Sequence, residues 1–462
     1  MKNLCWIRRD LRLHDHAALS HALRGGETTL VFIFDPHILD KLENKSDKRV
    51  TFIYQSLQEL EQKLQKKGSS LIIRYGKPEE EIPKLCQELK IEKVYTNRDY
   101  EPYAKKRDPL IEQNLKKLKV GFETFKDSVF FEKHEVLTGS GTVFKVFTPY
   151  KNKWLSLFDE VPEFECPLKK LTVFANPKNI LAFNWYPVIG FVEDIPLLTG
   201  GTSFAQKRLK NFDKVMEDYK EARNFPAIEG TSYLSVYIRF GNISIRDMIR
   251  AALETKNEGS TTWLSEIIWR DFYHTILDAF SYVEKSAFKK EYDHIKWPGN
   301  PQHFTAWCEG RTGVPIVDAA MRCLNQTGMM HNRLRMIVAS YLCKILLIDY
   351  RRGEHYFADH LLDYDLAANN GGWQWSSSSG CDAQPYFRIF NPYTQSEKFD
   401  ADGNFIRQWL PELAKVPKKE IHRPDTLLYQ DYPAPIVSYE TNRMLCSKVY
   451  AAAIQKKISP DK

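Results

Sequence analysis

Several patterns that would assign a chain to a common class are missing from this sequence. Its eight cysteines are scattered without a Cys-x-x-Cys pair, so we expect neither a disulfide framework nor a bound metal. No run approaches the roughly 18 apolar residues of a membrane span. Charges stand at the N-terminus, where a signal peptide would be apolar. These absences predict a cytoplasmic protein with reduced thiols and no membrane contact.

A glycine-rich dinucleotide fingerprint is also missing. Arg8-Arg9-Asp10 follows the first apolar run, where a Gly-x-Gly-x-x-Gly would begin. The net charge of +7 over 462 residues is compatible with one basic face but does not by itself indicate nucleic-acid binding. Aromatic residues are abundant, at 13% with ten tryptophans, and an aromatic-lined site would account for some of them.

Hydrophobic periodicity divides the chain into three parts. In residues 1–125, short apolar runs alternate with amphipathic stretches such as 51–66, which predicts a Rossmann-like α/β domain with a parallel sheet. Its strands are expected at 4–7, 29–34, 71–74, 94–96 and 122–125. Prolines punctuate residues 126–195, which we interpret as a connector. Residues 196–462 predict an all-helical domain, with helices expected at 203–224, 244–254, 261–279, 314–325, 331–348 and 356–362.

The segment of residues 363–400 has the most unusual composition. It combines Asp, Asn, Gly and Trp residues with a strip of Tyr and Phe mixed with Arg, Asn and Gln. Such mixtures suit a polar cofactor with a flat ring, or nucleic-acid bases, and an inert aromatic core would carry fewer polar groups. On a helix, Trp373 and Trp375 would face different environments. The alternative is that both anchor the core.

Two more stretches carry candidate site residues. Gly230, Thr231 and Ser232 precede a helical stretch, where hydroxyls and free backbone N–H groups bind phosphate or form a simple N-cap. In the helix expected at 261–279, one face carries a carboxylate, a guanidinium and aromatic rings, from Trp263, Glu266, Trp269, Arg270 and Tyr273. This mixture favours a pocket wall over the alternative, a Glu–Arg ion pair flanked by packed tryptophans.

A basic stretch opens the helix expected at 331–348. It contains His331 and Arg335, followed by an apolar continuation that favours burial. A buried Arg335 needs an anion, and Asp363 or Asp365 would serve. The alternative is a solvated basic helix.

Taken in chain order, these motifs resemble those of a known family. GTSxLSxY, WLxExIWRxFY, MHNRLRM, DxDLAANNGGWQW and PYFRIFNPxTQxEKFDxxGxFIRQWLPEL run across residues 230–413, and WIRRDLRLHDHAAL and FIFDP stand near the N-terminus. The set resembles the class I cyclobutane pyrimidine dimer DNA photolyases of the photolyase/cryptochrome family. The resemblance implies a monomeric, light-driven repair enzyme with an α/β antenna domain and a helical domain that holds FAD.

The resemblance also implies the flavin contacts. Asn369 corresponds to the residue beside flavin N5, and Arg335 and Asp363 to an ion pair over the ring. The full set of implied flavin contacts is Tyr219, Thr231, Ser232, Tyr233, Leu234, Ser235, Trp263, Arg335, Asp363, Tyr364, Asp365 and Asn369. Reduced, light-excited FAD would donate one electron to the dimer, whose ring opens before the electron returns.

Substrate contacts are implied in the same way. The dimer must leave the duplex, and its damaged pairing makes flipping cheap. Trp269 and Trp375 would offer flat faces to the bases, and Glu266 would hydrogen-bond a thymine edge. The implied DNA contacts are Arg223, Glu266, Trp269, Arg270, Tyr273, Asn332, Arg333, Trp375 and Gln395. The implied catalytic set is Glu266, Trp269, Asn332, Met336, Asn369 and Trp375.

The implied electron relay contains one departure from the family. It maps onto Trp297, Tyr350 and Trp373, and its middle member is a tyrosine where the family has tryptophan. Oxidation of a tyrosine generally requires loss of its proton. We therefore expect this hop to be slower, or the electron to take another route.

Two further departures concern the cofactors. The resemblance implies a second antenna chromophore, but Tyr103-Ala104 replaces the Asn-Glu pair of folate-type members, so its identity, folate or deazaflavin, stays open. Met329 stands where the family usually has tryptophan, and methionine can fill that space.

Three other functions fit parts of the sequence. A cryptochrome would sense blue light without repair, but Asn369 stands where plant cryptochromes carry Asp, and there is no long C-terminal extension. A (6-4) photolyase would carry two histidines four apart near Asn332 and Met336, and this chain does not. A nucleotide-binding oxidoreductase is disfavoured by the missing glycine fingerprint.

Overall fold

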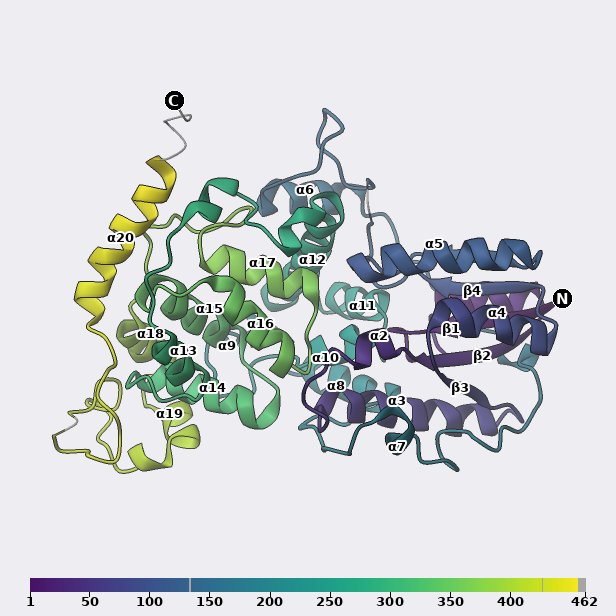
Figure 1. Ribbon diagram of the computed structural model, residues 1–462, viewed down its shortest axis with the longest axis horizontal. Coiled ribbons are helices and arrows are strands. Elements are labelled where there is room, and N and C mark those ends of the chain that lie inside the picture. Colours follow the sequence, from purple (N-terminus) through teal and green to yellow (C-terminus); the bar gives the residue numbers. More distant parts are fainter. Residues whose placement is uncertain (133, 426, 456–462) are drawn as a thin grey trace. The chain divides into compact units, whose positions relative to one another are not determined.

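The computed structural model describes residues 1–132, 134–425 and 427–455 (Figure 1). The chain forms two compact units. The first unit comprises Met1–Gly141, Lys151–Glu217 and Ser232–Asp278, and the second comprises Thr142–Tyr150, Asp218–Thr231 and Ala279–Lys462. Among the described residues, no helix has the length and apolar character that crossing a membrane would need.

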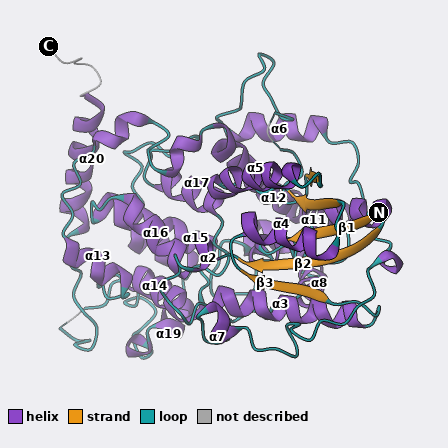
Figure 2. Ribbon diagram, turned by 45° about the vertical axis from the view of Figure 1, so that its right-hand side comes forward, coloured by secondary structure: helices purple, strands orange, loops and turns teal. Residues whose placement is uncertain are grey.

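A five-stranded parallel sheet forms the centre of the first unit (Figure 2). Its strand order is β3-β2-β1-β4-β5, with bounds β1 Lys2–Ile7, β2 Glu27–Phe34, β3 Leu71–Tyr75, β4 Lys93–Asn97 and β5 Gly121–Phe125. Each predicted strand lies within one of these elements, so the predicted parallel sheet is confirmed. Central parallel strands are covered on both faces, which is why they read as continuous apolar runs.

The helices of the first unit cover this sheet and extend beyond it. Their bounds are α1 Ala17–Gly25, α2 Pro36–Leu39, α3 Lys48–Gln65, α4 Pro78–Leu89, α5 Pro102–Lys117, α7 Tyr186–Ile189, α8 Thr202–Asp213, α10 Ser235–Arg239, α11 Ile245–Thr255 and α12 Glu258–Ala279. Helix α6 (Phe147–Leu157) has its first four residues in the second unit and the rest in the first. Ile82 and Leu85 of α4 and Ile111 of α5 pack on one face of the sheet, against Leu4 and Trp6. The amphipathic stretch 51–66 is confirmed as α3.

The long helix predicted at 203–224 is wrong. Helix α8 ends at Asp213, and a 3₁₀ turn, η2 (Met216–Asp218), and the short helix α9 (Tyr219–Ala222) follow. Met216 is fully buried, and its carbonyl oxygen lies only 1.9 Å from where a Cβ on Gly259 would stand. The chain therefore leaves the helical path to pack its backbone against α12, a contact that only glycine permits.

The second unit contains only helices and loops in its described residues. Their bounds are α9, α13 Pro301–Cys308, α14 Pro315–Thr327, α15 Asn332–Ser340, α16 Tyr350–His360, α17 Leu366–Ser376, α18 Pro392–Phe399, α19 Asn404–Trp409 and α20 Tyr439–Gln455, with shorter turns at η3 Ser281–Glu284, η4 Lys290–His294 and η6 Pro411–Leu413. The predicted helical character is confirmed. Helices α13 and α17 to α20 had no separate prediction.

The helix predicted at 331–348 is shorter than expected. Helix α15 gives way to a wider π-type turn, η5 (Tyr341–Ile345), and Leu347 adopts a left-handed backbone with φ of 53°. Helix α16 begins six residues before the predicted start at 356, because Asp349 caps it by accepting a 3.0 Å hydrogen bond from the backbone N–H of Arg351.

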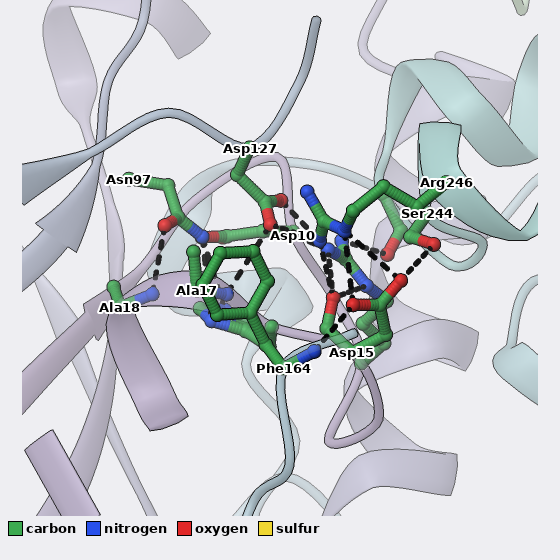
Figure 3. Close-up of polar contacts among 12 residues, drawn as sticks. Asp10, Asp15, Ala17, Ala18, Asn97, Asp127, Phe164, Ser244 and Arg246 are labelled. Atoms are coloured by element: carbon green, nitrogen blue, oxygen red, sulfur yellow. Dashed lines mark hydrogen bonds and ion pairs between the residues drawn. The ribbon is translucent and has the colours of Figure 1, made fainter. Parts of the chain in front are cut away.

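A buried ionic cluster in the first unit joins segments far apart in the sequence (Figure 3). Both Arg12 and Arg246 donate to Asp127, at 2.7 and 2.8 Å. Arg246 also donates to Asp15 at 2.9 Å, and Ser244 donates to the same carboxylate at 2.6 Å. Burial acts to raise the pKa of Asp127, but the two guanidinium groups hold it well below its usual range. We refer to Arg12, Asp15, Asp127, Ser244 and Arg246 as the unit-one ionic cluster.

Candidate active site

Helix α15 and the loop before α17 place a charge pair in the second unit. Arg335 Nη2 donates to the two carboxylate oxygens of Asp363 at 3.0 and 2.8 Å, and Arg335 Nε donates to the carbonyl of Met330 at 2.8 Å. The side chain of Asp363 is 4% exposed and that of Arg335 is 28% exposed. The predicted contact between Arg335 and Asp363 is therefore present, and one part of the guanidinium stays accessible.

Helix α17 orients the amide of Asn369. Asp365 caps the helix, accepting from the N–H of Ala368 at 3.2 Å, and this fixes the first turn. Nδ2 of Asn369 donates to the backbone carbonyl of Glu354 at 3.0 Å. This hydrogen bond engages Nδ2, and the amide oxygen of Asn369 accepts none from the described residues, so it can accept one from a ligand.

Glu354 itself is a site residue that the sequence did not indicate. Its Oε1 accepts a 2.9 Å hydrogen bond from Nδ2 of Asn370, next to Asn369. Burial raises the pKa of Glu354 to about 7. Its role depends on the packing of α16 against α17, and a glutamate in a polar helix carries no sequence signal for such a contact.

The two tryptophans of α17 lie in different environments, as predicted for a helix. Trp373 is 2% exposed, and its ring centroid lies 5.0 Å from that of Phe357 and 6.1 Å from that of Trp307. Trp375 is half-buried, with Phe390 at 6.5 Å. The alternative of two equivalent core anchors is wrong.

The start of α15 carries buried polar atoms without protein partners. His331 precedes the helix as its N-cap, and its Nδ1 accepts from the N–H of Arg333 at 3.2 Å. Within the described residues, Nε2 of His331 and Nε of Arg333 are buried and have no hydrogen-bond partner. Burial and the nearby arginines lower the pKa of His331 to about 4. Such groups normally find a partner, so they point to a bound ligand or water.

The remaining predicted residues near α15 differ in how they are held. Arg333 Nη2 donates to Asn224 at 2.5 Å, and its guanidinium lies 4.4 Å from the ring centroid of Phe399. Asn332 is exposed, whereas Met336 is half-buried, and its sulfur lies 3.7 Å from Nη1 of Arg333. Gln395, on α18, is half-buried. Their assignment to DNA binding stays a prediction.

The predicted relay residues also lie in this unit. Tyr350 is 2% exposed, and the Arg351 guanidinium lies 4.7 Å from its ring centroid. Trp297 is half-buried, with its ring 5.9 Å from that of Tyr450. Met329 is buried. Asp365 is buried, and Tyr364 is half-buried.

In the first unit, α12 carries the predicted aromatic and acidic residues. The helix is confirmed, with Trp263 buried against Phe212 at a centroid distance of 5.0 Å. Trp269 and Tyr273 are half-buried and lie 5.3 Å apart. Glu266 is half-buried, and Arg270 donates to the backbone carbonyl of Ser128. Trp263 is therefore buried, while the other predicted residues of this helix, within about three turns of it, are partly accessible.

The stretch 231–235 does not act as a simple N-cap. Helix α10 begins at Ser235, and Leu234 precedes it without any side-chain cap. The carbonyl of Ser232 accepts from Arg208 Nε at 3.0 Å, and the Arg208 guanidinium lies 4.5 Å from the ring of Tyr233, which has a left-handed φ of 52°. Thr231 is half-buried and belongs to the second unit.

The two remaining predicted residues precede this stretch. Tyr219 is 8% exposed, and its ring lies 5.6 Å from the guanidinium of Arg223. Both residues come from α9 and its C-cap, in the second unit.

Side chains also gather at the carboxyl ends of β1 and β2. Tyr103 donates from its hydroxyl to Asp35 at 2.7 Å and stacks on His37 at 4.4 Å. Arg107 lies 5.0 Å from the Tyr103 ring and 4.8 Å from that of Trp6. Ligands of doubly wound folds bind at this edge of the sheet, so the Tyr103 departure falls where an antenna chromophore would be recognised.

Comparison with known proteins decides the family. Residues 3–168 match the family model "DNA photolyase", and residues 263–452 match the model "FAD binding domain of DNA photolyase". The deoxyribodipyrimidine photo-lyase of Escherichia coli (strain K12) is 41% identical over 471 residues, which cover 98% of each chain. The chain belongs to the DNA photolyase family.

Solved structures agree with this membership. A bacterial class III photolyase from Agrobacterium tumefaciens has a TM-score of 0.89 at 32% identity, covering 98% of each chain. An archaeal photolyase from Sulfolobus tokodaii, described with two FAD molecules, has a TM-score of 0.84 at 34% identity, covering 98% of this chain and 100% of that chain. The α/β sheet unit and the helical unit are therefore the photolyase fold.

The residues present fit the FAD that the family model implies. Arg335 and Asp363 supply paired opposite charges, Asn369 supplies an oriented amide, and His331 and Arg333 keep buried nitrogens without partners among the described residues. A flat heterocycle with donors and acceptors around its edge is complementary to such a mixed set.

Proposed function

We propose that this chain is a light-dependent DNA repair enzyme, a deoxyribodipyrimidine photo-lyase that splits cyclobutane pyrimidine dimers. The observation that carries the proposal is the 41% identity, over 98% of both chains, to the Escherichia coli protein of that name. The charge pair of Arg335 with Asp363 and the oriented amide of Asn369 support it in this chain.

The flavin-binding residues are proposed as follows. FAD, when bound and reduced, supplies the electron that opens the cyclobutane ring under light. Arg335 and Asp363 would hold the ring system through their charge pair, and Asn369 would accept a hydrogen bond at the ring edge. The rest of the cofactor would be held by Tyr219, Thr231, Ser232, Tyr233, Leu234, Ser235, Trp263, Tyr364 and Asp365.

The substrate residues divide by chemistry. Trp269 and Trp375 would stack on the flipped bases, since both indoles are half-buried and keep an accessible face. Glu266 would hydrogen-bond a thymine edge and stabilise charge on the dimer. Asn332 and Met336 would complete the pocket. The backbone phosphates would be held by Arg223, Arg270, Arg333, Tyr273 and Gln395.

A second chromophore is part of the proposal. The Sulfolobus tokodaii photolyase is described with a second FAD as a light-harvesting cofactor. In this chain, Tyr103 and Ala104 replace the pair that contacts folate in folate-type members, and the local sequence 98–104 is more similar to deazaflavin-type members, so the choice between a folate and a deazaflavin type stays open. Mass spectrometry of the chromophores released from the purified protein distinguishes them.

Three organisational features complete the proposal. The chain would comprise an antenna domain over residues 1–125, a connector over 126–195 and a catalytic domain over 196–462. It would act as a monomer, as the family resemblance implies. It would work in the cytoplasm, where its eight cysteines stay reduced.

The test uses the purified protein and an oligonucleotide that contains one thymine dimer. The expected result is a bound flavin in the visible spectrum and loss of dimers under blue light but not in the dark. Absence of flavin, or equal dimer loss in light and dark, would overturn the proposal. A cryptochrome would bind flavin and leave the dimers intact.

A further inference from the structure

The relay position Tyr350 is poorly placed to pass on an electron. The Arg351 guanidinium lies 4.7 Å from its ring centroid and is itself paired with Asp349 and Asp293, so the ring lies in a charged environment rather than against other oxidisable rings of the described residues. Burial raises the pKa of both Tyr350 and Tyr356, so the two tyrosines differ in their ring neighbours and not in how firmly they hold the phenol proton. Among the described residues, the rings close to Trp373 are those of Phe357 and Trp307, and not that of Tyr350.

A second chain of oxidisable rings starts at Trp373. The Trp307 ring, on α13, lies 6.1 Å from that of Trp373 at an interplanar angle of 70°. The Tyr356 ring, on α16, lies 5.6 Å from that of Trp307 at 66°. All three rings belong to the second unit. Electron transfer weakens steeply with separation, so rings in direct contact favour successive short hops.

This chain of rings leads towards the surface. Trp373 and Trp307 are 2% and 0% exposed, whereas Tyr356 is half-buried. The hydroxyl of Tyr356 lies 2.7 Å from Oδ1 of Asn325, which is exposed, and 3.0 Å from the carbonyl of Cys308. Oxidised tyrosine must release its phenol proton, and a hydroxyl beside an exposed amide can release it to water.

Gly353 keeps the first ring in place. A Cβ at this position would lie 2.1 Å from Cη2 of Trp373, so only glycine lets that indole pack directly on α16. The same helix carries Tyr356 less than one turn further on. Helix α16 therefore supports both ends of the route.

We propose that the electron supply of this chain runs from Tyr356 through Trp307 to Trp373 and bypasses Tyr350. This inference rests on the proposed function, because it concerns how light brings a photolyase flavin to its reduced state. With flavin bound and excited by light, Trp373 would give up one electron to it, Trp307 would then reduce Trp373, and Tyr356 would reduce Trp307. Tyr356 releases its phenol proton to water as a neutral radical, which a thiol in solution then reduces.

The test is the identity of the radical formed under light. The flavin-loaded protein in its oxidised state is illuminated, and tyrosyl radical is measured by electron paramagnetic resonance while flavin reduction is followed by absorbance with a thiol present. Tyr356→Phe is compared with Tyr350→Phe. Tyr429→Phe, which removes another surface hydroxyl, bonded to Glu420 at 2.8 Å, is the matched control.

The proposal expects the tyrosyl signal to vanish in Tyr356→Phe and to persist in Tyr350→Phe and Tyr429→Phe. Photoreduction in Tyr356→Phe should slow about tenfold, which corresponds to ~1.4 kcal/mol of barrier. Trp307→Phe is a second variant, and it should lose the same signal while keeping its flavin. A signal that persists in Tyr356→Phe, or that vanishes in Tyr350→Phe, would overturn the bypass.

Failure of the proposed function has a different signature. Dimer repair is also assayed after chemical reduction of the flavin, which removes the need for any relay. Loss of repair by the reduced parent protein would overturn the photolyase proposal. Repair by the reduced parent, together with an unchanged radical in Tyr356→Phe, would overturn only the route.

Discussion

Two polar clusters in this molecule are built from similar residues but differ in how completely they are satisfied. In the unit-one ionic cluster, two arginines and two aspartates are fully buried and bonded to one another. In the second unit, Arg335 pairs with Asp363, but His331 and Arg333 keep buried nitrogens without a protein partner in the described residues. A closed network stabilises the fold, whereas one with spare donors and acceptors is suited to a ligand.

The largest effect is expected from opening the closed cluster. Asp127→Asn should lower the free energy of unfolding by ~3–5 kcal/mol, because Arg12 and Arg246 would stay buried without their shared counter-ion. Urea unfolding followed by circular dichroism measures the change. Asp402→Asn, at an exposed pair with Lys418, is the control and should leave the transition unchanged.

Overpacking the contact between α16 and α17 should come next. Gly353→Ala would place a methyl group 2.1 Å from Trp373 and should cost ~1–3 kcal/mol. Gly139→Ala, where a Cβ would meet nothing within 4 Å, should be neutral. Thermal unfolding compares the two, and equal midpoints would show that Trp373 relaxes without cost.

Ionisation of Glu354 should give a smaller, pH-dependent effect. Its pKa is raised to about 7 from an ordinary value of 4.5, so the fold favours the neutral acid. The resulting stability is present below pH 4.5 and is lost as the pH rises through 7. The parent should lose ~2 kcal/mol relative to Glu354→Gln between pH 5 and 8. If the free energies of unfolding of the parent and of Glu354→Gln changed equally between pH 5 and 8, the raised pKa of Glu354 would be contradicted.

Substitutions in the polar cluster of the second unit, formed by His331, Arg333, Arg335 and Asp363, should mainly weaken flavin binding. Asp363→Asn leaves Arg335 without its anion, and we expect about tenfold weaker flavin binding, equivalent to ~1.4 kcal/mol. The unfolding transition of the flavin-free protein should move less than that of Asp127→Asn. Flavin released on dilution is measured by fluorescence. If Asp363→Asn kept its flavin but unfolded at as low a urea concentration as Asp127→Asn, the two clusters would both serve stability.

Much of the fold was predictable because local patterns and tertiary packing agree. The strands at 4–7 and 29–34 are apolar because both faces of a parallel sheet are buried. The helix at 331–348 was overextended, since the turn at η5 and the left-handed Leu347 depend on tertiary packing that periodicity does not encode.

The candidate site was predictable where chemistry forces a partner. A buried Arg335 requires an anion, which limited the choice to Asp363 or Asp365, and Asp363 is the partner found. Glu354, Trp307 and the unit-one ionic cluster were missed. Asp127 and Arg246 are 119 residues apart in the sequence, so only the fold brings them together.

The central claim is that this chain repairs dimers with light through a flavin held by the Arg335–Asp363 pair. The direct measurement is dimer loss under blue light by the reduced, flavin-loaded protein, compared with Asp363→Asn and Asp402→Asn. The account predicts repair in the parent and in Asp402→Asn, none in the dark, and in Asp363→Asn a loss of repair that follows its about tenfold weaker flavin binding. Repair in the dark, or full repair by a flavin-free Asp363→Asn, would contradict it.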